Sequence, residues 1–120
     1  MIPFCEGRIG GGLDQLGARS DDPDDGGALG RLERRPVDYF RMFYGDTALF
    51  GAWHAMESGL AFFGADHVLF GTDMPFDPEK GPGFIRETIA AMDRMRASDD
   101  DKARIYEGNA RRLLRLRLSA

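Results

Sequence analysis

The sequence is poor in the residues that most often build a self-contained reactive site. Its 120 residues include one cysteine and two histidines. Cys5 has no second cysteine to pair with, so the chain forms no internal disulfide, which fits a reducing compartment. No histidine or cysteine cluster has zinc-site spacing, and no serine lies in a Gly-x-Ser-x-Gly elbow. The sequence therefore gives no support to a self-contained zinc centre or to nucleophilic catalysis.

A basic excess and a long apolar run are also missing. Sixteen Lys and Arg stand against twenty Asp and Glu, a net charge of −4, which argues against a nucleic-acid surface. No apolar run approaches the roughly 20 residues that span a bilayer, and the start lacks the layout of a signal peptide. We therefore expect a cytoplasmic protein that binds neither nucleic acid nor membrane. Apolar residues make up 42% of the chain, which is enough for the core of one domain.

The most informative stretch is a short apolar run that ends in polar residues. Val68-Leu69-Phe70 is too short for a helix and stops at Gly71, which predicts a buried strand. Asp73 then lies at the C-terminal end of that strand, where the loops of α/β folds carry catalytic groups. The spacing alone also fits an Asx turn or a helix cap. We take Asp73 as the first candidate for a catalytic residue.

A second strand and a helix are predicted before this stretch. Residues 37–45 are rich in aromatic residues and predict a strand, residues 48–63 have the apolar spacing of a helix, and residues 67–71 form the next strand. This order predicts a parallel, right-handed βαβ unit, and so an α/β fold. Asp46 follows the first strand as Asp73 follows the second. It either caps the helix that is expected near Ala48 or faces a substrate.

The remaining segments have weaker signals. Residues 1–17 are dense in glycine and predict a loop with at most a helical turn. Residues 17–36 are expected to form a flexible acidic surface loop. Residues 84–95 predict a helix, Ser98 is expected to cap another, and Asn109 is expected to cap the last.

Four motifs, taken together, carry a resemblance to a known family. They are Met1-Ile2-Pro3-Phe4 with Gly7-Arg8, Tyr44-Gly45-Asp46-Thr47, Leu69-Phe70-Gly71-Thr72-Asp73-Met74-Pro75-Phe76, and Ile105-Tyr106-Glu107-Gly108-Asn109-Ala110. They resemble motifs of the amidohydrolase-related family of metal-dependent hydrolases, in particular its aminocarboxymuconate-semialdehyde decarboxylase-like members. In order, they are similar to the segment after a metal-site histidine on strand six, the end of strand seven, the last strand and the closing helix of that family. The likeness spans nearly all of residues 1–118.

The resemblance implies a fold and a chemistry. Members are (β/α)8 TIM barrels of about 250 residues or more, so residues 1–120 would be a partial domain, the last two β/α units of such a barrel. The family's metal site is a histidine cluster closed by one aspartate, which Asp73 matches; no residue here matches the histidines. The implied cofactor is a divalent metal, expected to be zinc. Asp73 would ligate it or handle a proton, and Asp46 would contact substrate. The implied reaction is hydrolysis or non-oxidative decarboxylation of a small carboxylate-bearing or cyclic molecule.

A non-enzymatic alternative stays open. A partial barrel leaves sheet edges unpaired and apolar helix faces uncovered, which favours association. The chain could then be a truncated, catalytically inactive α/β piece that acts as a homo-oligomer or as an interaction subunit.

Overall fold

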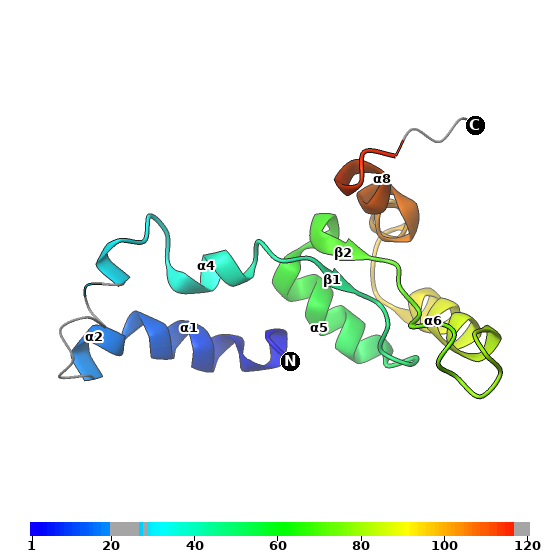
Figure 1. Cartoon of the computed structure of the whole chain (residues 1–120), viewed down its shortest axis with the longest axis horizontal. Helices are drawn as coiled ribbons and strands as arrows, with labels where there is room; N and C mark the ends of the chain where they lie inside the picture. The colour runs from blue at the N-terminus through cyan, green and yellow to red at the C-terminus, as the bar shows by residue number, and fades with distance from the viewer. Residues whose placement is uncertain (20–26, 28, 117–120) are drawn as a thin grey trace. The chain divides into compact units, whose positions relative to one another are not determined.

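The chain forms two compact units, residues Met1–Phe43 and Tyr44–Ala120. The computed structural model describes residues 1–19, 27 and 29–116 (Figure 1). Most of the loop that we predict over residues 17–36 lies outside the described residues, so its flexibility stays a prediction.

The first unit is helical, which corrects two expectations from the sequence. A 3₁₀ turn at Pro3–Cys5 leads into α1 (Glu6–Asp14) and α2 (Leu16–Arg19), and α4 (Pro36–Phe40) follows. The predicted loop over residues 1–17 is therefore wrong. The predicted strand over residues 37–45 is also wrong, except at its last residue, Gly45, which lies in a strand of the second unit.

Contacts between α1 and α4 explain the first of these errors. Gly10 is buried, and a Cβ atom at this position would lie 3.4 Å from the Cβ of Val37. Ion pairs of Arg35 with Asp14 and of Arg41 with Glu6 join the two helices. Glycine lowers helix propensity, but packing against a second helix contributes more than propensity does. The glycine here permits the close approach.

Proline explains the second error. Pro36 occupies the first turn of α4, where its fixed φ favours a helix and its missing N–H costs nothing. The aromatic residues that suggested a strand instead lie in and after this short helix.

The second unit contains the predicted parallel strand pair. Strands β1 (Gly45–Asp46) and β2 (Val68–Leu69) pair in parallel, with Gly45 opposite Val68 and Asp46 opposite Leu69. Helix α5 (Trp53–Phe63) connects them, and a 3₁₀ turn at Ala65–His67 precedes β2. The strand–helix–strand order is confirmed. Both strands are shorter than expected. Strand β2 ends at Leu69, and the backbone N–H of Phe70 then donates to the carbonyl of Ile105 at 2.9 Å.

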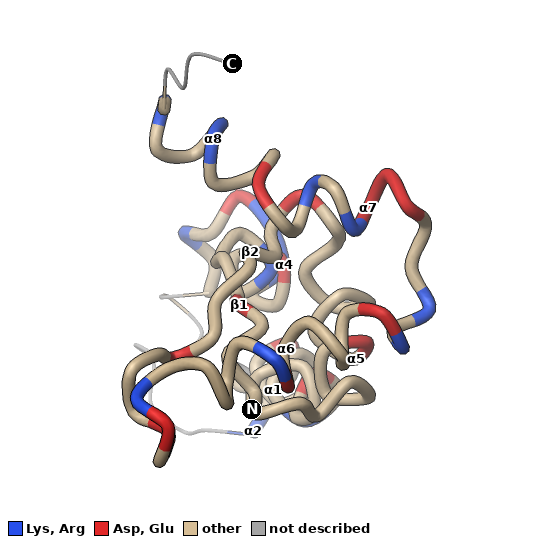
Figure 2. The backbone as a smooth tube through the Cα atoms, turned by 90° about the vertical axis from the view of Figure 1, so that its right-hand side faces the viewer, with Lys and Arg blue, Asp and Glu red and all other residues tan. Residues whose placement is uncertain are grey.

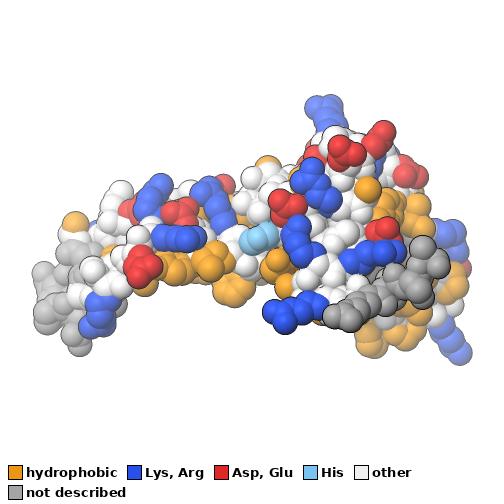
Figure 3. Space-filling model, turned by 90° about the horizontal axis from the view of Figure 1, so that it is seen from above, with side chains coloured by type: hydrophobic (Ala, Val, Ile, Leu, Met, Phe, Trp, Pro, Cys, Tyr) orange, Lys and Arg blue, Asp and Glu red, His pale blue; other side chains and the backbone are white. Residues whose placement is uncertain are grey.

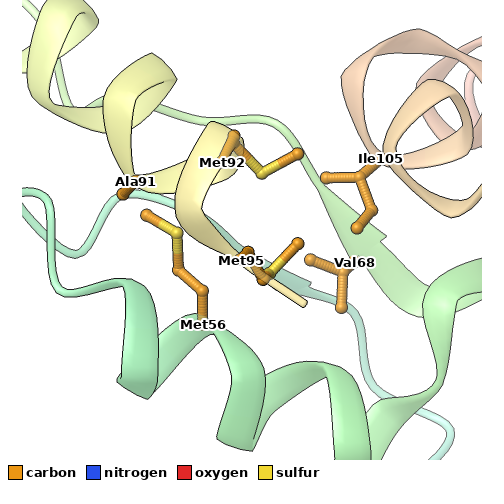
Figure 4. Packing of buried hydrophobic residues seen from close by; sticks show 6 residues of the cluster. All are labelled: Met56, Val68, Ala91, Met92, Met95 and Ile105. Carbon is orange, nitrogen blue, oxygen red and sulfur yellow. The ribbon is translucent and has the colours of Figure 1, made fainter. Parts of the chain in front are cut away.

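A small core holds this unit together. It joins Met56 of α5, Val68 of β2, Ile105, and three residues of the α6 region (α6 is Pro82–Arg94), as Figure 4 shows: Ala91, Met92 and Met95. Met92 and Ile105 are fully buried. Methionine fills irregular gaps, which suits a core built where helices meet a two-stranded sheet. The predicted helix over residues 84–95 is confirmed and begins two residues earlier, at Pro82.

Three short helical segments end the described chain. In α7 (Asp99–Ala103), the Ser98 hydroxyl accepts a hydrogen bond from the Asp101 N–H at 3.1 Å, which confirms the predicted cap. Figure 2 shows the acidic first turn of α7 in red. A π-helix (Arg104–Gly108) and α8 (Asn109–Leu113) follow.

Asn109 does not cap the last helix, because the helical backbone runs into α8 without a break. Its buried side-chain amide instead donates to the carbonyls of Ala65 and Val68, at 2.6 and 2.8 Å. Asn109 therefore fixes the start of β2.

The surface and the helices bear on the predicted partners. On the face in Figure 3, basic and acidic side chains are interspersed. Among the described residues, no helix has both the length and the apolarity that are needed to cross a membrane. That this chain binds no nucleic acid stays a prediction.

Candidate functional site

A threonine that the sequence analysis did not single out joins the C-terminal ends of the two strands. The Thr47 hydroxyl accepts from the Gly71 N–H at 3.0 Å and donates to the Gly71 carbonyl at 2.9 Å. The Thr47 N–H also donates to the carbonyl of Leu69 at 3.1 Å. The Thr47 side chain is only 1% exposed. This contact fixes the chain after β1 to the chain after β2.

Asp46 lies beside the same glycine. A Cβ atom at Gly71 would lie 3.3 Å from the Cβ of Asp46. The Asp46 Oδ1 accepts from the Ala48 N–H at 2.9 Å, as in an Asx turn. The predicted helix cap is wrong in its detail, because α5 begins at Trp53 with Ala52 as its N-cap residue. Asp46 is exposed at the strand end, so a role in substrate contact stays a prediction.

Asp73 follows two residues after Gly71 and has an unusual backbone. Its φ is 61°, in the left-handed region that non-glycine residues seldom adopt and that Asp tolerates better than most. The Thr72 hydroxyl accepts from the Met74 N–H at 3.4 Å, and the Asp73 carbonyl accepts from the Phe76 N–H at 3.3 Å. These contacts define the turn.

The carboxylate of Asp73 takes no part in holding this turn. It is exposed, and it makes no hydrogen bond or ion pair within the described residues. In this part of the chain, therefore, the side chain forms neither the Asx turn nor the helix cap that the spacing also allowed. Its two oxygens are available to a ligand.

Asp77 is a second residue that the sequence analysis missed as structurally important. Its side chain is 5% exposed and accepts from the N–H groups of Glu79 at 2.7 Å and Phe84 at 3.3 Å. Burial by itself raises the pKa of this carboxyl, but backbone N–H groups, those of Gly81 and Gly83 included, lower the pKa below its usual value. Asp77 thus fixes the loop between Asp73 and α6.

Glycine is required next to this carboxylate. A Cβ atom at Gly83 would lie 2.9 Å from the Asp77 Oδ1. The only sequence signal was an aspartate followed by two glycines and two prolines before a predicted helix. Because the capping residue precedes the helix by several residues, the usual spacing of an N-cap did not reveal it.

The described residues offer a metal ion few ligands. No group of three or more His, Cys, Asp or Glu side chains that could hold a metal is present among residues 1–19, 27 and 29–116. His54 lies edge-on against Trp53 at 5.3 Å between ring centroids, and His67 stacks on Tyr44 at 4.5 Å. Among the residues that the structure describes, Asp73 is the predicted metal ligand, its carboxylate has no partner there, and its role stays a prediction.

The family follows from a sequence comparison. The amidohydrolase family model matches residues 10–116, so the chain belongs to the amidohydrolase family. No sequence among curated proteins matches the chain.

The solved structures that this chain resembles include decarboxylases. A dihydroxybenzoic acid decarboxylase from Polaromonas sp. JS666, with bound manganese and the inhibitor 2-nitroresorcinol, is 26% identical with a TM-score of 0.69. A 2,6-dihydroxybenzoate decarboxylase complexed with 2,6-dihydroxybenzoate is 25% identical with a TM-score of 0.66. The IDCase of Metarhizium anisopliae, at 24% identity and a TM-score of 0.72, supports the fold alone.

The alignments also show what share of each relative's length this chain covers. The three alignments cover 98%, 96% and 99% of this chain but 32% of each relative. The relatives are TIM-barrel amidohydrolases, so the chain is consistent with part of such a barrel. The described residues are mostly helical with one two-stranded sheet.

Proposed function

We propose that this chain is the C-terminal portion of a metal-dependent enzyme that decarboxylates a small aromatic carboxylic acid without oxidation. The relatives at 25% and 26% identity are both decarboxylases of dihydroxybenzoates, which favours decarboxylation over hydrolysis. The observation that carries the proposal is the Asp73 carboxylate. It lies on a turn at the C-terminal end of a parallel strand and is bound to nothing in the described chain.

The carboxylate of Asp73 is suited to be one ligand of a divalent metal ion. A carboxylate suits hard divalent ions such as Mn²⁺ and also serves Zn²⁺. The manganese in one relative supports a divalent metal without selecting zinc. One carboxylate fills one position, so the other ligands would come from outside the described residues. A bound metal would stabilise negative charge that develops on the substrate.

Decarboxylation breaks the bond between the ring carbon and the carboxylate. Carbon dioxide leaves, and the electron pair that remains on the ring carbon takes up a proton. In this proposal Asp73 either holds the metal or supplies that proton, and Asp46 on the other side of Gly71 contacts the substrate. Thr47 keeps the two aspartates in register, because its hydroxyl binds both backbone groups of Gly71.

Two matched substitutions in the complete, metal-loaded protein test the proposal. Asp73→Asn keeps the shape of the side chain and removes its charge, so release of carbon dioxide from 2,6-dihydroxybenzoate should fall about 100-fold or more. Asp46→Asn keeps an oxygen for the Ala48 N–H and a polar group for the substrate, so it should lower the rate clearly less than Asp73→Asn does. Near-normal turnover and unchanged metal content in Asp73→Asn would contradict the assignment.

A further inference from the structure

The loops after both strands meet at the N-terminal end of α6. From the first loop, the Phe50 ring stacks on Phe84 with 4.4 Å between centroids and 27° between planes. From the second loop, Met74, the neighbour of Asp73, reaches Gly81: a Cβ atom there would lie 3.3 Å from the Met74 Cε. In Figure 1 both loops lie at the end of the unit where α6 begins. Phe50 and Asp73 are thus on loops that are anchored to the same end of one helix.

The first loop has a second contact with this helix. A Cβ atom at Gly51 would lie 3.1 Å from the Glu87 Oε2, and Gly51 has a φ of 82°. Phe50 and Gly51 therefore press the loop against two successive turns of α6.

The conformation of Phe50 is costly and its ring is exposed. Its φ is 50°, a genuine outlier for a bulky residue, yet its side chain is 58% exposed. A strained residue of this kind persists where the surroundings fix it, often at a functional site. Phe84 stacks on one face of the ring. Because more than half of the side chain is still exposed, the exposed surface includes the open face opposite Phe84.

The N–H groups at the N-terminal end of α6 already have a hydrogen-bond acceptor. Asp77 accepts hydrogen bonds from the first N–H groups of α6, including that of Phe84. The amides that could have bound an anionic substrate group are therefore in use. What this end of the unit offers to a ligand is the ring of Phe50.

We propose that Phe50 determines specificity for an aromatic substrate, whose ring stacks on the open face of Phe50 while its reacting end faces Asp73. Phe84 is a positioning residue that keeps the Phe50 ring in place. The inference rests on the proposed function, and the aromatic ligands of two relatives, 2,6-dihydroxybenzoate and 2-nitroresorcinol, are of the chemical class that such a ring accepts.

The test measures binding rather than turnover. The dissociation constant of 2-nitroresorcinol is measured by calorimetry on the complete, metal-loaded protein. Phe50→Asn removes the ring but tolerates a positive φ, so the backbone should be retained. The affinity should fall about tenfold in Phe50→Asn and stay within about twofold in Phe50→Tyr, the scale of one aromatic stacking contact. Malonate, which has no ring, should bind all three proteins equally.

A double substitution tests the role of Phe84. If Phe84 acts through Phe50, then Phe84→Leu should weaken 2-nitroresorcinol binding in the wild type and have no further effect in Phe50→Asn. Independent, additive losses would contradict a positioning role.

Several outcomes would overturn the inference. Unchanged 2-nitroresorcinol affinity in Phe50→Asn would do so, and so would a lower melting temperature with unchanged affinity, which would mean that the ring is buried against protein. A wild type that does not bind 2-nitroresorcinol would also overturn it. If binding depends on Phe50 but 2,6-dihydroxybenzoate is not decarboxylated, the inference stands and the proposed reaction fails.

Discussion

Replacing Thr47 with valine removes one hydroxyl and keeps the shape of the side chain. That hydroxyl makes two hydrogen bonds, from the Gly71 N–H and to the Gly71 carbonyl. At about 1 kcal/mol for each bond, Thr47→Val should lower the local stability of the segment that leads to Asp73 by about 2 kcal/mol. Because Thr47 is buried, water cannot readily replace the hydroxyl. A loss of this size raises the population of the open segment about 30-fold.

Hydrogen exchange measures this opening directly. The Gly71 amide in Thr47→Val should exchange about 30-fold faster than in the wild type, and the turnover should fall because the turn that carries Asp73 is no longer fixed. Thr47→Ser is the control: it keeps both hydrogen bonds and loses one buried methyl group, about 0.8 kcal/mol. Its Gly71 exchange should rise only about fourfold. Equal exchange in the valine variant and the wild type would refute the role of Thr47.

Two further predictions concern the 120-residue chain by itself. It should bind Zn²⁺ no tighter than about micromolar, because the described residues bring together no group of three or more metal-binding side chains, whereas a zinc site usually has four ligands; a tight one-to-one site in calorimetry would contradict this. It should associate rather than remain a compact monomer, because large apolar side chains are exposed, such as Phe4 at 92% and Leu114 at 63%. Light scattering that shows a monodisperse species of 13.3 kDa would count against it.

Local sequence signals predicted those parts of the fold that neighbouring residues determine. The apolar run before Gly71 identified β2, and the strand–helix–strand spacing identified the parallel pair. Ser98 followed by Asp101 identified the start of α7. In each case the partners are a few residues apart or repeat with a regular period, so a single sequence contains the signal.

The errors arose where distant residues decide the structure. Helix α1 forms although it is rich in glycine, because Gly10 lets it approach Val37 of α4. The contact between Thr47 and Gly71 joins residues 24 positions apart. The family resemblance placed Asp73 at the end of the last strand, but neither resemblance nor spacing indicated that its carboxylate would be left without a partner. That follows only from the hydrogen bonds of the folded chain.

The pH dependence of stability should separate Asp77 from the exposed aspartates. Burial raises the pKa of Asp77, but hydrogen bonds from backbone N–H groups lower it by more, so the folded value lies below the unfolded one. The ionised carboxylate therefore stabilises the fold fully above about pH 3.9, and this stabilisation is lost as the pH falls through the lower, folded value. Asp77→Asn should melt at a lower temperature at pH 7, and its difference from the wild type should shrink below about pH 4.

A salt series provides the control for this prediction. The pKa of Asp66 is also lowered, by hydrogen bonds from Arg104 and Arg112 on the exposed surface, so the effect of Asp66→Asn should weaken as sodium chloride is raised. The Asp77 carboxylate is bound by uncharged backbone groups and buried, so the effect of Asp77→Asn at pH 7 should persist in salt. Two results would contradict this account: the effects of Asp66→Asn and Asp77→Asn on the melting temperature decline together in salt, or the melting difference of Asp77→Asn is the same at pH 7 and pH 3. Either result would mean that the backbone N–H groups around Asp77 do not stabilise its charge, and that other contacts fix the loop that leads to α6.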